Sequence, residues 1–223
     1  EVDGRFLWGC SGDKPATVEV TAADEFTPYV APRTADVVQR SDDPYHVTRF
    51  HAELSGADLH VSVKMYLDPY DVGVSAADVA AVRESFELGV DAFWNGRFTV
   101  DSDAGRGSVG FSIDWVEDRS NAHYVVEVGP GNQPEASIGS IEDPDATPQS
   151  NEFGTPGLIG PSNPITTFAH EYGHAIGLVR EDYFSPSHPG SHASDEPSIM
   201  GQSHRFPLGA RPTRRHATEL SGL

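Results

Sequence analysis

The residues with the clearest chemical potential lie at positions 170–174, where the chain reads His-Glu-Tyr-Gly-His. Two histidines four positions apart lie one above the other on a helix face, so both imidazoles can reach one metal ion. Glu171 follows the first histidine, where its carboxylate can take the proton of an attacking water molecule. The pattern predicts a Zn²⁺ site held by His170 and His174, with Glu171 as the catalytic base.

A helix is predicted through this motif, ending at Gly177. Asn163 is expected to cap its N-terminus, and Pro164 suits the first helical position because an N–H there would have no partner in the helix. Small and apolar residues flank the histidines and favour burial of the helix: Ala169, Ala175, Ile176 and Leu178.

Further features make the motif similar to that of the metzincin zinc peptidases. Gly177 lies three residues after the second histidine, as in their extended motif, and residues 198–201 (SIMG) resemble the methionine turn beneath their metal. The order of predicted elements before the motif resembles that of their N-terminal lobe. The run HEYGHAIGLVREDY, followed by SIMG and then Arg215-His216, is most similar to the peptidase domains of bacterial Rhs-type polymorphic toxins, which typically read HExGHxLGLxDEY.

The resemblance implies an α+β fold, namely a metzincin-like, two-lobed zincin with a mixed sheet, a backing helix and an HExxH active-site helix. Residues 46–223 would form the zinc metallopeptidase domain, with an upper lobe over about 46–177 and a lower lobe over about 178–223. The implied activity is that of a Zn²⁺-dependent endopeptidase acting on a protein or peptide substrate, as a bacterial toxin, an effector or a secreted protease. An inhibitory or immunity protein is an implied partner.

The third zinc ligand is where the sequence departs from this family. The family's ligand lies three residues after the glycine, and Arg180 is found there, whose charged guanidinium cannot ligate zinc. Glu181 or Asp182, but only one of them, is favoured, because the tyrosine that follows them keeps the family's Asp-Glu-Tyr order in a register shifted by one residue. His192 and His216 stay open as alternatives.

The remaining elements must position this helix. Residues 75–94 form the clearest amphipathic helix, with apolar residues at spacings of three and four, and Ser75 with Asp78 resembles a capping box. Alternating apolar residues predict strands over 46–54, 58–67, 97–100, 108–116 and 122–128. The histidines in or beside these strands, His46, His51, His60 and His123, are interpreted as strand residues without a metal role.

Little regular structure is predicted elsewhere. Residues 1–45 are punctuated by prolines and are expected to form an irregular N-terminal extension. Residues 129–161, rich in Gly, Pro, Ser and acids, are expected to form a long surface loop with one short edge strand near 138–141. A final helix is predicted near 213–221.

Charge and composition restrict the function further. The 223 residues include 34 acidic and 15 basic side chains, for a net charge of −19, which argues against binding to nucleic acid or docking on anionic lipid. No apolar stretch approaches the ~18 residues of a membrane span, and residues 1–20 lack the features of a signal peptide. The single cysteine excludes an internal disulfide framework. The resemblance then implies a protein that is secreted, or delivered into a target cell, by a route not visible in this chain.

Two other hypotheses stay open. The first is a zinc-binding interaction module without turnover, which would bind zinc and cleave nothing. The second is a surface protein in which HExxH arises by chance, which would bind no stoichiometric metal.

Overall fold

The computed structural model describes residues 4–8, 16–20, 33–40, 47–69, 72–131, 152–153, 155–156, 158–178, 198–200 and 212. Its strands are β1 Gly4–Trp8, β2 Ala16–Val20, β3 Arg33–Arg40, β4 Val47–Ser55, β5 Asp58–Pro69, β6 Thr99–Ser102, β7 Gly105–Trp115, β8 Tyr124–Val128, β9 Glu152–Phe153, β10 Thr155–Pro156 and β11 Leu158–Ile159. Its α-helices are α1 Ala76–Phe93 and α2 Ile165–Ala175.

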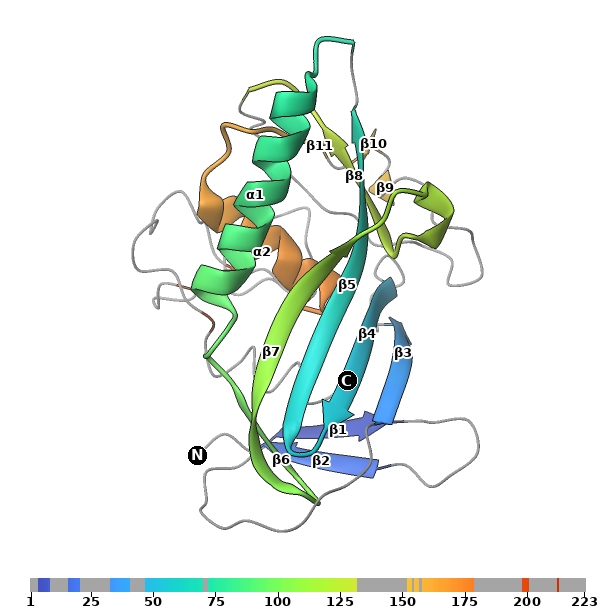
Figure 1. Cartoon of the computed structure of the whole chain (residues 1–223), viewed down its shortest axis with the longest axis vertical. Helices are drawn as coiled ribbons and strands as arrows, with labels where there is room; N and C mark the ends of the chain where they lie inside the picture. The colour runs from blue at the N-terminus through green and yellow to red at the C-terminus, as the bar shows by residue number, and fades with distance from the viewer. Residues whose placement is uncertain are drawn as a thin grey trace.

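Six strands form a mixed, curled sheet, and with α1 and α2 they make an α+β fold (Figure 1). β4 is antiparallel to β3 and to β5, whereas β5 is parallel to β7 and β8, and β8 is parallel to β11. The first half of β7 also pairs with β6, which joins the β1–β2 ribbon at the lower end of Figure 1. The predicted α+β class with a mixed sheet is confirmed.

β5 is the central strand, and its alternating side chains divide the sheet into two faces. The apolar set faces the helices and is at most 5% exposed, comprising Leu59, Val61, Val63 and Met65. These residues share one core cluster with side chains of both helices and of β4, β7 and β8. The intervening residues of β5 point away from that core and make the outer face polar. They are His60, Ser62 and Lys64.

α1 begins with the capping box that the sequence predicts. Ser75 Oγ accepts a hydrogen bond from Asp78 N at 3.2 Å, and Asp78 Oδ2 accepts one from Ser75 N at 2.8 Å. These two bonds satisfy N–H groups that the first turn of a helix leaves without partners. The helix then ends at Phe93, which confirms the amphipathic helix predicted over 75–94.

α1 and α2 cross in close contact, and together they cover the core-facing side of the sheet (Figure 1). At the crossing, a Cβ on Gly89 would lie 3.0 Å from Ala169 N, so only glycine allows this approach without a shift of the backbone. Phe86 packs edge-on against Phe168 with 4.9 Å between the ring centroids. Among the described residues, neither helix has the length and apolar character needed to cross a membrane.

The prediction of irregular structure for residues 1–45 is wrong at three places. β1 pairs with β2 over five residue pairs, and β3 pairs along its whole length with β4. Among the β3 side chains that the structure describes, Ala35 and Val37 pack against the core, and this alternation is too short to stand out among the prolines nearby. Pairing with β4 supplies the hydrogen bonds that β3 cannot make by itself.

Residues 129–161 also contain strands that the sequence does not predict. β11 adds two residues parallel to β8, and β9 pairs with β10. Strands of two residues carry no periodicity, so the pattern of the sequence cannot reveal them. The edge strand predicted near 138–141 and the helix predicted near 213–221 lie outside the described residues.

Candidate metal centre

The active-site helix of the sequence prediction is α2, and its start differs from the prediction by one residue. Pro164 has the extended backbone of an N-cap, and Asn163 lies outside the helix. The Asn163 side chain accepts a hydrogen bond from Gly160 N at 2.8 Å, so it closes the turn before the helix and does not cap it. The predicted cap at Asn163 is therefore wrong, because a local turn competes for the amide oxygen.

The imidazoles of His170 and His174 each bind a backbone carbonyl through Nδ1. His170 Nδ1 donates to Ile199 O at 3.0 Å, and His174 Nδ1 donates to Leu178 O at 2.7 Å. A carbonyl oxygen can only accept, so Nδ1 of each ring carries a proton. In the neutral rings, Nε2 is then the atom that can act as a metal ligand.

The two Nε2 atoms lie 3.1 Å apart. Two neutral rings with their protons at Nδ1 would direct two lone pairs at each other, so this geometry requires a proton or a metal cation at that point. Two nitrogens at ~2.0–2.1 Å from one tetrahedral zinc ion are separated by about 3.3 Å. The donor set therefore fits Zn²⁺, which His170 and His174 would hold through Nε2, with their tautomers set by backbone carbonyls.

Glu171 places a carboxylate beside these nitrogens. Its side chain is buried, with the residue 4% exposed, and Oε1 lies 4.0 Å from His170 Nε2. That distance is too long for a hydrogen bond to the ring. The carboxylate is instead positioned next to the point on which the two Nε2 atoms converge, where a general base would be needed.

The C-terminus of α2 reverses at Gly177, which has φ +106°. Leu178 N donates to Gly173 O at 3.0 Å and Gly177 N donates to His174 O at 3.1 Å, the two bonds of a Schellman motif. This reversal brings Leu178 O onto His174 Nδ1. The glycine that the sequence analysis singles out is therefore needed here for a left-handed turn that orients a histidine.

Residues 198–200 pass under the histidine pair. Ile199 O accepts the hydrogen bond from His170, and Met200 N donates to Ser198 Oγ at 3.1 Å. Met200 is fully buried, and a Cβ on Gly173 would overlap its sulfur atom. Gly173 thus allows the methionine to pack directly on the backbone of α2 between the two histidines.

Aromatic side chains anchor α2 to the rest of the core. Trp94 Nε1 donates to Ala169 O at 2.8 Å, and Tyr172 OH donates to Ser112 O at 3.1 Å. Burial raises the pKa of the Tyr172 phenol, so it stays a donor at neutral pH. The role of Trp94 was not predicted, because a bond between residues 75 positions apart produces no local pattern in the sequence.

The third ligand is not placed by these contacts. Glu181, Asp182, His192 and His216, the four candidates of the sequence analysis, all lie outside the described residues. Within the described part of the chain, no group of three His, Cys, Asp or Glu side chains is arranged to hold a metal ion. The structure brings the two histidine Nε2 atoms and the Glu171 carboxylate close together, and the choice among the four candidates for the third ligand stays a prediction.

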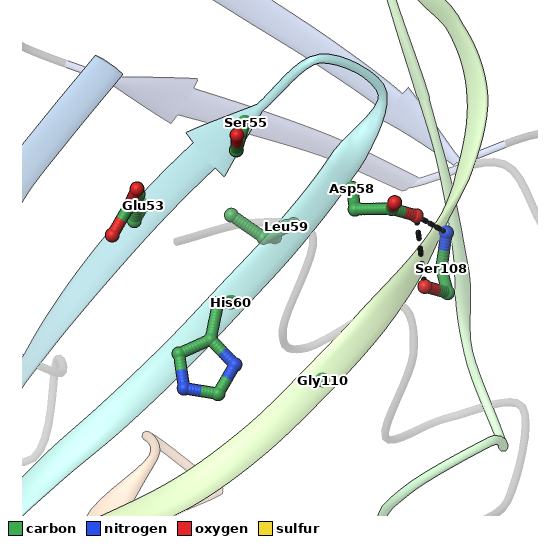
Figure 2. A pocket seen from close by; sticks show the side chains of 7 residues that line it. All are labelled: Glu53, Ser55, Asp58, Leu59, His60, Ser108 and Gly110. Carbon is green, nitrogen blue, oxygen red and sulfur yellow. Dashed lines mark hydrogen bonds between the residues drawn. The ribbon is translucent and has the colours of Figure 1, made fainter. Parts of the chain in front are cut away.

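A polar hollow lies on the outer face of β4, β5 and β7, and its lining residues are Glu53, Ser55, Asp58, Leu59, His60, Ser108 and Gly110 (Figure 2). Asp58 Oδ1 accepts hydrogen bonds from Ser108 N at 2.7 Å and Ser108 Oγ at 2.8 Å, which lower the Asp58 pKa. Figure 2 shows that the Asp58 carboxylate turns toward Ser108 and away from His60. The polar groups of this hollow do not converge on one point, in contrast to those of α2.

No protein-family model matches this sequence, and no curated protein matches it.

Proposed function

We propose that this protein is a zinc-dependent endopeptidase in which His170 and His174 bind Zn²⁺ and Glu171 is the general base. The observation that carries the proposal is the convergence of two Nε2 atoms, 3.1 Å apart, beside a buried carboxylate 4.0 Å from one of them. When bound, the ion supplies a Lewis acid that polarises the substrate carbonyl and makes water a better nucleophile at neutral pH.

The residues of α2 have separate tasks in the hydrolysis. Glu171 accepts a proton from the attacking water and then gives it to the nitrogen of the leaving amine, so that one peptide bond and one water become a carboxyl group and an amine. His170 and His174 present Nε2 as ligands because Ile199 O and Leu178 O hold their Nδ1 protons. Burial of Glu171 strengthens its electrostatic effect on the reacting groups.

Features of the fold support a metzincin-like, two-lobed zincin with α1 as the backing helix. α1 and then β6 lie between the parallel strands β5 and β7 in the chain, and β8 and β11 continue the sheet before α2. Gly177 turns the chain out of the helix, and the segment with Met200 passes beneath the histidines. In this proposal the upper lobe covers about 46–177 and the lower lobe about 178–223.

The resemblance supports the rest of the proposal. Glu181 or Asp182 would complete the ligand set, with His192 and His216 as the alternatives. The substrate would be a protein or peptide, and the protein would act as a secreted protease or as a toxin delivered into a target cell. An inhibitory or immunity protein would then be its partner in the producing cell.

The test compares Glu171→Gln with Glu53→Gln, a matched change in the outer hollow. Metal analysis and cleavage of a peptide library are measured on the same preparations after zinc reconstitution. We expect about one zinc per chain in wild type and both variants. Cleavage should fall by at least ~10²-fold in Glu171→Gln, because proton transfer is lost, and should be unchanged in Glu53→Gln.

Each possible outcome has a distinct meaning. Zinc binding without cleavage by wild type would favour an interaction module and overturn the peptidase. The absence of stoichiometric zinc would overturn the metal site itself. Cleavage by Glu171→Gln at about a tenth of the wild-type rate or more would remove Glu171 from the role of base, since a general base contributes ~10²-fold or more.

A further inference from the structure

The last turn of α2 contains four backbone carbonyls that lack a partner within an ideal helix. Three of them are satisfied by the chain that follows, because Tyr172 O, Gly173 O and His174 O accept from the N–H groups of Ile176, Leu178 and Gly177. The fourth belongs to Ala175, which is fully buried and directly follows the second histidine. Its oxygen accepts a hydrogen bond from a side chain 51 positions away.

That side chain is Tyr124, the first residue of β8. Its hydroxyl donates to Ala175 O at 3.0 Å and accepts from Arg49 N of β4 at 2.9 Å. The residue is 1% exposed, and burial raises the pKa of the phenol, which keeps the proton needed for donation. One hydroxyl group therefore joins β4 and β8 to the end of the active-site helix.

The paired strands and this hydroxyl are geometrically linked. β4 pairs with β5 over residues 51–55. Before that segment, the backbone N–H of Arg49 donates to the Tyr124 hydroxyl instead. β8 pairs with the upper half of β5 and so fixes where Tyr124 stands. The position of the hydroxyl is set by the sheet, and the end of α2 takes its position from the hydroxyl.

We infer that Tyr124 is a positioning residue for His174. The hydrogen bond to Ala175 O holds the turn in which Gly177 reverses the chain, and that turn presents Leu178 O to His174 Nδ1. Tyr124 acts through this turn and does not touch the reacting atoms. The inference deepens the proposed function, on which its zinc-binding consequence rests.

Removal of the hydroxyl has a specific structural consequence. In Tyr124→Phe the ring still fills the core, but Ala175 O is left buried without this donor, which is unfavourable. The final turn can relieve this by opening to water, which breaks the two bonds of the Schellman motif. Opening moves Leu178 O away from His174 and releases the ring from its tautomer and orientation.

The matched control is Tyr172→Phe, which removes the hydroxyl of a buried tyrosine that belongs to α2 itself. Tyr172 OH donates to Ser112 O in β7, and this bond does not involve the turn at Gly177. Tyr172→Phe loses the bond to Ser112 O, whereas Tyr124→Phe loses the bond to Ala175 O and also the one from Arg49 N, so Tyr124→Phe should lose more overall stability. Only Tyr124→Phe should disturb the end of α2.

The first measurement is amide and imidazole proton exchange by NMR on the zinc-free full chain. We expect Leu178 N–H to exchange at least tenfold faster in Tyr124→Phe than in wild type, and the His174 Nδ1 proton signal to weaken. Both signals should be retained in Tyr172→Phe. Equal exchange in wild type and Tyr124→Phe, or equal loss in both variants, would overturn the positioning role.

The second measurement is zinc affinity by competition with a chelator. Partners of a ligating histidine typically change metal affinity by 10–100-fold, so we expect Tyr124→Phe to bind zinc at least tenfold more weakly than Tyr172→Phe. If wild type binds no zinc, the proposed function fails, whereas the exchange experiment still judges the role of Tyr124. If zinc affinity is equal in both variants, the positioning role is overturned.

Discussion

Two sets of histidines in this molecule differ in where their ring nitrogens point. The two on α2 direct both Nε2 atoms to one place, 3.1 Å apart, with their Nδ1 atoms on backbone carbonyls. The three sheet histidines each bind a separate neighbour: His51 with Asp36, His60 with Ser112, and His123 with the backbone N–H of Lys64.

The difference follows from the geometry of the two kinds of element. A spacing of four residues on a helix places two side chains on one face, one turn apart. In a sheet, register gives each side chain its own cross-strand neighbours, and Asp36 is opposite His51 as Gly110 is opposite His60. Convergence of ligands is therefore a local property on α2, and it does not arise among the sheet histidines.

The largest effect is expected when one histidine of each set is replaced by alanine. In the proposed site His170→Ala would remove a direct ligand, and we expect zinc affinity to fall by more than ~100-fold, the upper range for outer partners. His60→Ala, which loses a surface bond to Ser112 Oγ, should leave zinc affinity within about twofold of wild type, since it touches no ligand partner. Competition titration with a chelator measures both. Equal weakening would mean that the pair on α2 is not the metal site.

A pair of glycine substitutions compares the packing of the two regions. In Gly173→Ala the new methyl overlaps the Met200 sulfur and lies 2.9 Å from Trp94 Cζ2, and both neighbours are fully buried. Such overpacking costs about 1–3 kcal/mol, which exceeds the ~1 kcal/mol that alanine gains in a helix. We expect a net loss of up to about 2 kcal/mol in the free energy of unfolding.

Gly110→Ala is the control on the outer face of the sheet. Its methyl would lie 3.1 Å from His60 Nδ1, but this ring is exposed and can move aside. The free energy of unfolding should stay within about 0.5 kcal/mol of wild type. Urea unfolding measures the free energy of unfolding of both variants. A larger loss in Gly110→Ala than in Gly173→Ala would contradict the contrast between the two regions.

The smallest expected effect concerns pH and His123. Burial lowers its pKa from 6.5 to about 4, with contributions from the nearby positive charge of Lys64, whereas Asp36 opposes the shift. The unfolded chain takes up this proton below pH 6.5 and the folded chain does not, so stability falls as the pH decreases from about 6.5 to about 4. Below that window the contribution of His123 no longer changes.

His123→Asn tests this sign. The asparagine oxygen can replace Nδ1 as the acceptor for Lys64 N, while it carries no titratable proton. We expect the free energy of unfolding, measured by urea unfolding at pH 7 and pH 4.5, to depend less on pH in His123→Asn than in wild type. An unchanged or steeper dependence would show that His123 is not held neutral by the fold.

The two regions also differ in how far the sequence predicts them. The capping box at Ser75, the alternation of β5 and the histidine spacing of α2 are all local patterns, and the structure has each of them. β3 and β11 were not predicted, since the described part of β3 has two apolar side chains against the core and β11 has two residues. Their existence depends on pairing with β4 and β8.

The spacing in the sequence is enough to predict that His170 and His174 lie one turn apart on a helix with Glu171 between them, because helix periodicity depends only on bonds between residues four apart. How those side chains are oriented depends on contacts with distant parts of the fold. Ile199 O reaches His170 across 29 positions, and Tyr124 reaches the end of α2 across 51. Such contacts depend on the packing of α1, α2 and the sheet into one core, and no local pattern in the chain encodes their distances.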